Sequence, residues 1–164
     1  MCAMDREEFG RFVDGVGFPM YVVTAATDDE RAGCLLTFAH RVSIDPPLFL
    51  VSISGKNRTC DVARRADHLA VHLLGPDAHG LAELFGGETS EDTDKFAGVG
   101  WREGPGGAPL LDDVPRVMVG RVLERYDWAD HVGHLLEPVA VEVRGGEPGL
   151  ELTDVDDIEP GHPA

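Results

Sequence analysis

A pair of adjacent prolines near the middle of the chain, in Asp45-Pro46-Pro47, constrains the fold more than any other feature. Proline fixes its backbone angle φ and has no N–H group to donate to a sheet ladder, so no central strand can run through this tripeptide. The apolar runs at residues 42–44 and 48–53 are short and rich in β-forming side chains, which favours strands over a helix. The tripeptide therefore predicts a rigid turn between two separate strands.

Length, charge and cysteine usage limit the class of protein. A chain of 164 residues with 43% hydrophobic content predicts one domain with a full core. Its three cysteines are widely spaced and it has neither an apolar leader nor a run of membrane-spanning length, so we expect a cytoplasmic protein with reduced thiols. A net charge of −16 disfavours nucleic acid and anionic membranes as partners.

The rest of the sequence divides into short elements. Hydrophobic spacing and turn residues predict an opening helix at 5–16, a hairpin at 19–37, a strand at 68–74, a helix at 77–85 and a second hairpin at 116–143. Residues 88–109 are rich in Gly, Asp, Glu and Pro and predict a surface loop. We expect residues 1–150 to form the domain and the acidic residues 151–164 to form a frayed C-terminal tail.

Strands joined by tight turns, with short helices inserted, predict a mainly β fold built as an antiparallel barrel. A doubly wound sheet is not favoured, and neither of the familiar Gly-rich nucleotide loops, G-x-G-x-x-G after a strand or G-x-x-x-x-G-K-[ST], occurs. A phosphate group would have to be bound in another way. The basic residues Lys56, Arg58, Arg64 and Arg65 form the one locally positive stretch, although a solvated helix face would explain them equally well.

The order of these features resembles the flavin reductase-like, FMN-binding split-barrel family. The resemblance rests on Gly33, the Ser43-Ile44-Asp45-Pro46-Pro47 element, an apolar strand, a polar loop ending in Arg58-Thr59, the Leu81–Gly86 segment and a late Asp130-His131. It implies a homodimeric, antiparallel split β-barrel with Greek-key-like connections. It also implies an NAD(P)H-dependent oxidoreductase that binds FMN or FAD and passes hydride from the nicotinamide to the flavin, with a monooxygenase as a partner that uses the reduced flavin.

The resemblance also assigns roles to residues. His131 would lie near the flavin ring, where nicotinamide docks, and is the catalytic candidate. The cofactor-binding candidates run along the ring, along the ribityl chain and around the phosphate: Leu35, Leu36, Thr37, Phe38, Ala39, Ser52, Ile53, Ser54, Gly55, Lys56, Asn57, Arg58, Thr59 and Phe85. Backbone N–H groups after Gly55, the Thr59 hydroxyl and the Arg58 guanidinium are the types of donor that suit a phosphate dianion.

Three positions depart from the family pattern. Leu35 and Ala39 stand where many relatives have threonine and phenylalanine, and His40 stands where serine is common. These departures leave two alternatives to a reductase. One is a non-catalytic FMN-binding or electron-transfer protein, and the other is a split barrel that binds another cofactor, such as a deazaflavin.

The histidines and cysteines have plain structural explanations. His131 and His134 are three residues apart, which puts them on opposite faces of a strand, and His68 and His72 share a face but have no third ligand at an obvious spacing. We therefore expect no metal site. His131 itself could be a turn residue packed beside Trp128. Cys34 and Cys60 have no C-x-x-C spacing and resemble small buried hydrophobic residues.

Overall fold

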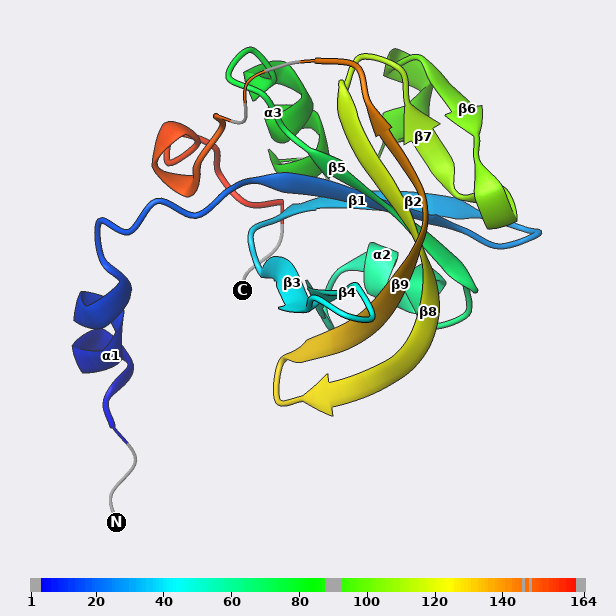
Figure 1. The fold of residues 1–164 in the computed structure, drawn as a ribbon. Helices are drawn as coiled ribbons and strands as arrows, with labels where there is room; N and C mark the ends of the chain where they lie inside the picture. The colour runs from blue at the N-terminus through cyan, green and yellow to red at the C-terminus, as the bar shows by residue number, and fades with distance from the viewer. Residues whose placement is uncertain (1–3, 88–92, 146, 148, 162–164) are drawn as a thin grey trace.

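The computed structural model describes residues 4–87, 93–145, 147 and 149–161, and it consists mainly of antiparallel β-structure (Figure 1). One sheet has seven strands in the order β2-β1-β5-β8-β9-β4-β3, and β6 and β7 form a separate two-stranded sheet. The elements are α1 (Arg6–Val13), β1 (Tyr21–Ala26), β2 (Arg31–Leu36), β3 (Ala39–Ser43), β4 (Leu48–Ser54), α2 (Arg58–Ala63), β5 (His68–Leu73), α3 (His79–Gly87), η1 (Lys95–Gly98), β6 (Trp101–Glu103), η2 (Pro105–Gly107), β7 (Pro109–Leu111), β8 (Arg116–Trp128), β9 (His131–Val143) and η3 (Leu152–Asp154).

Both predicted hairpins are confirmed. β1 and β2 pair in antiparallel register, and the Thr27 N–H closes their turn by donating to the Glu30 carbonyl at 2.8 Å. β8 and β9 form a long curved hairpin that crosses the whole molecule (Figure 1). The strands on either side of the Asp45-Pro46-Pro47 turn are β3 and β4, and they pair with each other as well. The turn predicted from the prolines therefore joins two neighbouring antiparallel strands.

The two edge strands of the large sheet, β2 and β3, are consecutive in the sequence and are joined by Thr37 and Phe38 alone. A two-residue link cannot span a flat seven-stranded sheet, because neighbouring strands lie about 4.8 Å apart. The sheet must therefore curl until its edges approach each other. The Ser52 N–H of β4 donates to the Phe38 carbonyl at 2.8 Å and fixes this link to the sheet.

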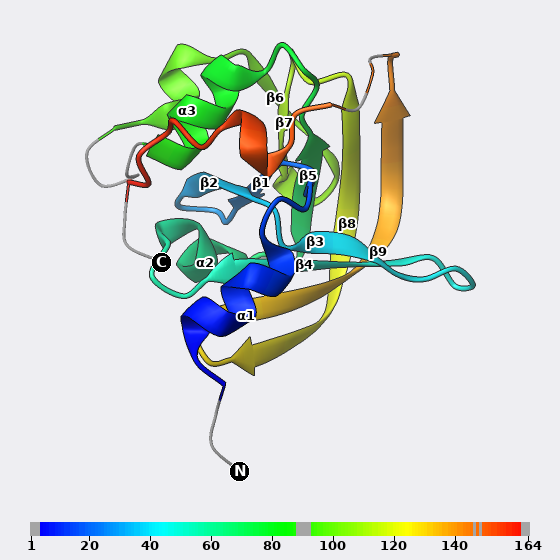
Figure 2. The same ribbon diagram turned by 90° about the vertical axis from the view of Figure 1, so that its left-hand side faces the viewer.

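The short helix α2 packs against β1, β2 and β4 and fills the space inside this curvature (Figure 2). Its apolar residues are completely buried, as are Val23, Val51 and Leu69 of the surrounding strands. This cluster is the main core, and burying side chains of this size stabilises a fold by about 1.5 to 3 kcal/mol each. Asn57 caps the helix by accepting from the Thr59 N–H at 3.0 Å, so the short helix begins at a defined residue.

A second apolar cluster lies between α3, the start of β1 and the C-terminal segment, and it corrects one expectation. Residues 151–161 are not frayed, because Val155 is buried in this cluster, Ile158 packs against it and the Gly161 N–H donates to the Gly86 carbonyl at 3.1 Å. The acidic composition of the segment gave no sign that Val155 and Ile158 pack into the core. Residues 162–164 lie outside the described part of the chain.

Two other segments differ from expectation. The predicted loop at 88–109 contains η1, β6, η2 and part of β7, although residues 88–92 lie outside the described part. The opening helix forms, but none of its residues is buried, and the Phe12 side chain is 80% exposed.

No helix among the described residues is long and apolar enough to cross a membrane.

Candidate functional site

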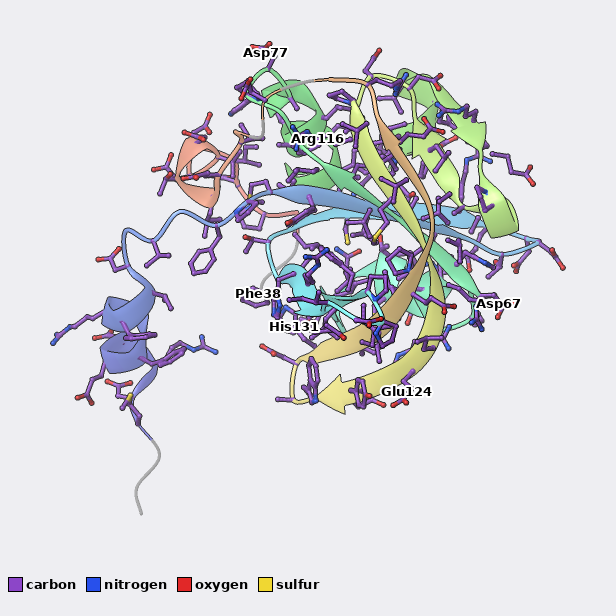
Figure 3. The ribbon with its side chains drawn as sticks, in the orientation of Figure 1. Phe38, Asp67, Asp77, Arg116, Glu124 and His131 are labelled. Carbon is purple, nitrogen blue, oxygen red and sulfur yellow. The ribbon has the colours of Figure 1, made fainter. Side chains whose placement is uncertain are left out.

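Three segments that are far apart in the sequence meet where β4 ends and β9 begins. This end of the two strands is called the site edge. Ser54, at the end of β4, pairs with His131, at the start of β9, and the Gly55 N–H donates to the Asp130 carbonyl at 2.8 Å. The ring of Phe38, from the link between β2 and β3, lies 5.2 Å from the His131 ring, centroid to centroid (Figure 3). The fold thus brings together Phe38, Ser54, Gly55 and His131, four of the residues predicted for the site.

The side chain of Phe38 is 59% exposed, so one part of its ring covers His131 and the rest faces solvent. A single exposed apolar side chain is ordinary, so the informative observation is that this ring lies against a histidine. Together they offer a planar ligand an aromatic contact and a polar contact within a few ångströms.

Asp130 fixes the orientation of the His131 ring. Its carboxylate lies 2.8 Å from His131 Nδ1, and this hydrogen bond lowers the pKa of Asp130 below its ordinary value. A carboxylate can only accept, so Nδ1 carries the proton in this pair and Nε2 is the nitrogen left to meet a ligand. The family resemblance assigns a role to His131 and none to Asp130, yet Asp130 contributes both this carboxylate and the carbonyl that holds Gly55.

The loop after β4 does not present its backbone as we expected. The Asn57 N–H donates to the Ser54 carbonyl, the Thr59 N–H to the Asn57 side chain, and the Cys60 N–H to the Asn57 carbonyl. With the Gly55 N–H also bonded, most of the donors predicted for a phosphate already have partners within the chain. An anion held here would therefore gain few backbone hydrogen bonds and would rely mainly on side chains.

Thr59 also faces away from solvent. The residue is completely buried, and its hydroxyl lies beside the thiol of Cys34. Burial raises the pKa of that thiol to about 11, so it is protonated at neutral pH. Cys34 and Cys60 are both free and buried, as predicted. In this structure Thr59 is part of the core around α2, and its hydroxyl does not face the exposed side of the loop.

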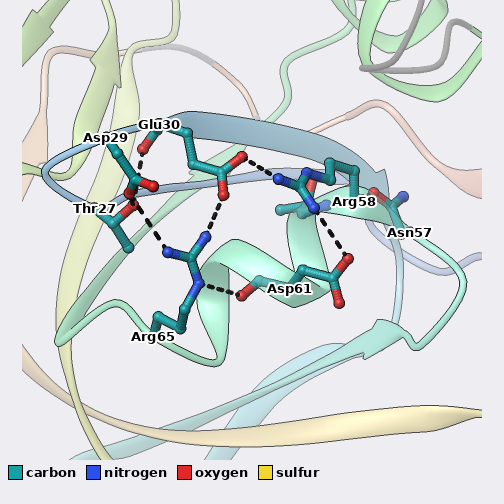
Figure 4. Close-up of polar contacts among 8 residues, drawn as sticks. Thr27, Asp29, Glu30, Asn57, Arg58, Asp61 and Arg65 are labelled. Carbon is teal, nitrogen blue, oxygen red and sulfur yellow. Dashed lines mark hydrogen bonds and ion pairs between the residues drawn. The ribbon is translucent and has the colours of Figure 1, made fainter.

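Arg58, a charged donor at the end of the loop, is held by carboxylates (Figure 4). Its Nη2 lies 2.6 Å from Glu30 Oε2 in the β1–β2 turn, and its Nη1 lies 3.5 Å from Asp61 Oδ2 one helical turn away. Glu30 also pairs with Arg65, which contacts Asp29 as well. The contact with Glu30 raises the pKa of Arg58. No sequence signal connects Glu30 with Arg58, because the two lie 28 residues apart.

The candidates on β2 and α3 belong mainly to the interior. Phe85 is 1% exposed and packs edge-on against Phe96. A Cβ atom on Gly86 would lie 2.7 Å from Leu35 Cδ2, so Leu35 faces α3 and fills the space beside this glycine. The departure at Leu35 therefore alters packing between β2 and α3 in this structure. Leu36 and Thr37 are half-buried, and the Thr37 hydroxyl donates to the Pro19 carbonyl at 2.9 Å. Ala39 of β3 and Ser52 and Ile53 of β4 are buried.

The buried histidines have structural partners. His72 Nδ1 lies 2.9 Å from the Val22 carbonyl and its Nε2 accepts from the Leu111 N–H at 3.0 Å, so the neutral ring links β5 to β1 and β7. His134 Nδ1 lies 3.1 Å from the Val132 carbonyl. Burial lowers the pKa of each ring to about 4. Within the described part of the chain, no three His, Cys, Asp or Glu side chains are grouped to hold a metal ion.

A separate cleft of about 670 Å³ lies between the β1–β2 turn and the β6–β7 hairpin. Five carboxylate residues line it, against two arginines and one histidine: Asp28, Asp29, Glu30, Asp67, Glu103, Arg31, Arg65 and His68. Such a surface repels a phosphate. The site edge, formed by Phe38, Gly55 and His131, is therefore the better candidate for an anionic ligand.

Comparison with known proteins agrees with this geometry. The family model described as flavin reductase like domain matches residues 13–157. An FMN reductase (NADH), RutF, from Pseudomonas syringae pv. syringae is 27% identical over 150 residues, which cover 92% of this chain and 84% of that protein. The reductase component of a 4-nitrophenol 4-monooxygenase/4-nitrocatechol 2-monooxygenase from Rhodococcus opacus is 28% identical over 145 residues, with 88% and 76% covered.

A solved structure shares the fold at lower identity. The NADH:FAD oxidoreductase SgcE6 of Streptomyces globisporus C-1027 superposes with a TM-score of 0.78 and 22% identity, and the match covers 90% of each chain. A family model that matches most of the sequence, from the end of α1 to beyond η3, accounts for the sheet and for all three segments of the site. The chain belongs to the flavin reductase like domain family.

Proposed function

We propose that this protein is an NAD(P)H-dependent flavin reductase that passes hydride from the nicotinamide to FMN, with FAD as the alternative flavin. The observation that carries the proposal is the meeting of Phe38, Gly55 and His131 at the site edge. The names of the relatives support it, since one is an FMN reductase (NADH) and another is the reductase component of a monooxygenase.

The residues of this edge suit a flavin. The exposed Phe38 ring offers a face to an aromatic ring system, and Gly55 has no side chain to obstruct the approach of a ligand. The Lys56 and Arg58 side chains, in the loop that follows, provide positive charge for a phosphate. A bound flavin supplies the hydride-accepting ring, so the chain needs no nucleophile and base of its own.

His131 positions the second substrate in this proposal. With Nδ1 directed to Asp130, Nε2 is the ring nitrogen that would meet the nicotinamide carboxamide. Asp130 holds the His131 ring in one orientation before the nucleotide binds, so the His131 side chain loses little conformational entropy on binding. His131 is then a contact to the reacting partners, and Asp130 is the residue that positions it.

We further propose that the curled sheet is a split barrel and that two copies form a homodimer. The outward residues of β9 support this, since Val139, Val141 and Val143 are 45% to 63% exposed in a single chain. The stacked Phe9 and Phe12 of α1 add a second exposed apolar surface. Apolar surface of this extent ordinarily marks an interface. Light scattering should give twice the mass of one chain, and the mass of a single chain would contradict the dimer.

The reduced flavin would pass to a separate monooxygenase, as the naming of the Rhodococcus opacus relative indicates for that protein. Such a transfer requires that the flavin leave the site within the catalytic cycle. A loosely bound, exchangeable flavin fits the proposal better than a permanently bound one.

The test is consumption of the nicotinamide. Purified protein is mixed with FMN and either NADH or NADPH, and the absorbance of the reduced nicotinamide is followed against a sample without protein. We expect acceleration with at least one nucleotide. Equal rates with and without protein, for both nucleotides, would refute the reductase, and FMN binding in the same sample would then identify a non-catalytic flavin carrier.

A further inference from the structure

We propose that Glu30 sets the affinity of this protein for the flavin phosphate by holding the Arg58 guanidinium in an ion pair that competes with the phosphate. The inference rests on the proposed function, because it takes the loop after β4 as the phosphate site. It adds a residue of the β1–β2 turn that determines how tightly the site binds phosphate.

The geometry around Arg58 is the first support. Both terminal nitrogens of its guanidinium already face carboxylates, with Glu30 at 2.6 Å and Asp61 at 3.5 Å (Figure 4). A phosphate binds arginine best through two parallel N–H···O bonds. The two carboxylates compete with the phosphate for these donors and for the positive charge, so their ion pairs weaken phosphate binding.

The backbone of the loop is the second support. The N–H groups of Gly55, Asn57 and Thr59 are bonded within the chain. A phosphate therefore gains few backbone contacts here, and its affinity depends on the charged side chains. Whether Arg58 is paired with a carboxylate or with the phosphate then determines a large share of the free energy of phosphate binding.

The local charge is the third support. Arg58 and Arg65 carry two positive charges, and three carboxylates face them, from Asp29, Glu30 and Asp61. Glu30 is the most protected of these carboxylates, with 23% of its side chain exposed against 58% for Asp61. It also bridges both arginines, so water screens its interaction least. Among the three acids, Glu30 is the effective competitor.

Binding measurements with FMN and riboflavin test the inference, since riboflavin has the same ring without the phosphate. Glu30→Gln should tighten FMN binding about fivefold, the effect of one unit charge a few ångströms away in water, and should leave riboflavin binding unchanged. The gain should shrink at high salt. Asp28→Asn is the matched control, because it removes one charge from the same turn at a residue with no ion pair among the described side chains. It should leave both affinities as they are.

The Arg58→Ala background separates competition from general charge. Arg58→Ala should weaken FMN binding, and Glu30→Gln added to it should have no more effect than Asp28→Asn, because no guanidinium remains to be released. Equal FMN affinity in Glu30→Gln and the parent would overturn the inference. Weaker FMN binding in Glu30→Gln would overturn it too, since Glu30 would then hold Arg58 in the binding position.

Binding of flavin is measured without nicotinamide, so the two proposals can fail separately. Protein that binds FMN as described but oxidises neither NADH nor NADPH contradicts the reductase and leaves the role of Glu30 standing. If the protein oxidises NADH in the presence of FMN but Glu30→Gln has the FMN affinity of the parent, the inference alone is contradicted. Absence of FMN binding in both the parent and Glu30→Gln contradicts both.

Discussion

The two buried histidines should make the stability of this protein fall steeply between pH 6.5 and 4. His72 is neutral in the fold because its Nδ1–H group donates to the Val22 carbonyl while Nε2 accepts from the Leu111 N–H. A second proton would face the Leu111 N–H group inside an apolar core. Burial accordingly lowers the pKa of both His72 and His134 from the ordinary 6.5 to about 4.

The direction of this change follows from the numbers of protons that the folded and the unfolded chain bind. Below pH 6.5 the unfolded chain takes up a proton at each histidine and the folded chain does not, so the free energy of unfolding decreases as the pH falls. Each histidine contributes a slope of up to about 1.4 kcal/mol per pH unit, and the two together remove roughly 5 kcal/mol between pH 7 and about pH 4.5. That is a large part of the roughly 5 to 15 kcal/mol that stabilises a typical domain.

Urea unfolding at a series of pH values measures this loss. His72→Gln should lower stability at pH 7 and should halve the slope between pH 6 and about 4.5, because one of the two protons is gone. His40→Gln, at an exposed position, is the matched control and should keep the slope of the parent. An unfolding free energy that stays constant across this range, or a His72→Gln slope equal to that of the parent, would refute the reasoning.

Three further predictions concern single residues. Gly33→Ala should lower the free energy of unfolding by about 1 to 3 kcal/mol, because its Cβ would lie 2.7 Å from a carbon of the buried Phe85 ring. Gly10→Ala, which has open space around its Cβ, is the control and should cause no such loss when the urea midpoints of the two variants are compared. Val155→Ala should cost about 1 to 2 kcal/mol in the same assay, and no loss would return residues 151–161 to the status of a tail. His131→Ala should lower kcat for NADH oxidation more than it weakens FMN binding, and unchanged kinetics would make His131 a structural turn residue.

The local elements of the fold could be read from the sequence because local chemistry determines them. The prolines placed the turn between β3 and β4, and short β-branched runs located both hairpins. The curl of the sheet could not be read in the same way, since it follows from the pairing of β4 with β9 and of β5 with β8, which join residues far apart in the chain. The three-residue strands β6 and β7 were also missed, because so few residues in a Gly- and Pro-rich segment carry no periodic signal.

The candidate site was only partly readable for the same reason. The family resemblance selected Phe38, Gly55 and His131, and the fold brings them together. It also selected Thr59, whose side chain is buried in the core, since sequence alone does not reveal which face of a six-residue helix turns inward. The pairing of Glu30 with Arg58 depends on tertiary structure and has no sequence signature.

The most direct test of the central claim is flavin reduction observed without oxygen. FMN is mixed with NADH or NADPH under anaerobic conditions, and the visible absorbance of the oxidised flavin is followed with a catalytic amount of the protein and without it. The proposed function predicts that the protein bleaches the flavin far faster than the free nucleotide does, and that His131→Ala slows the bleaching. Bleaching at the same rate with and without the protein, for both nucleotides, would contradict it.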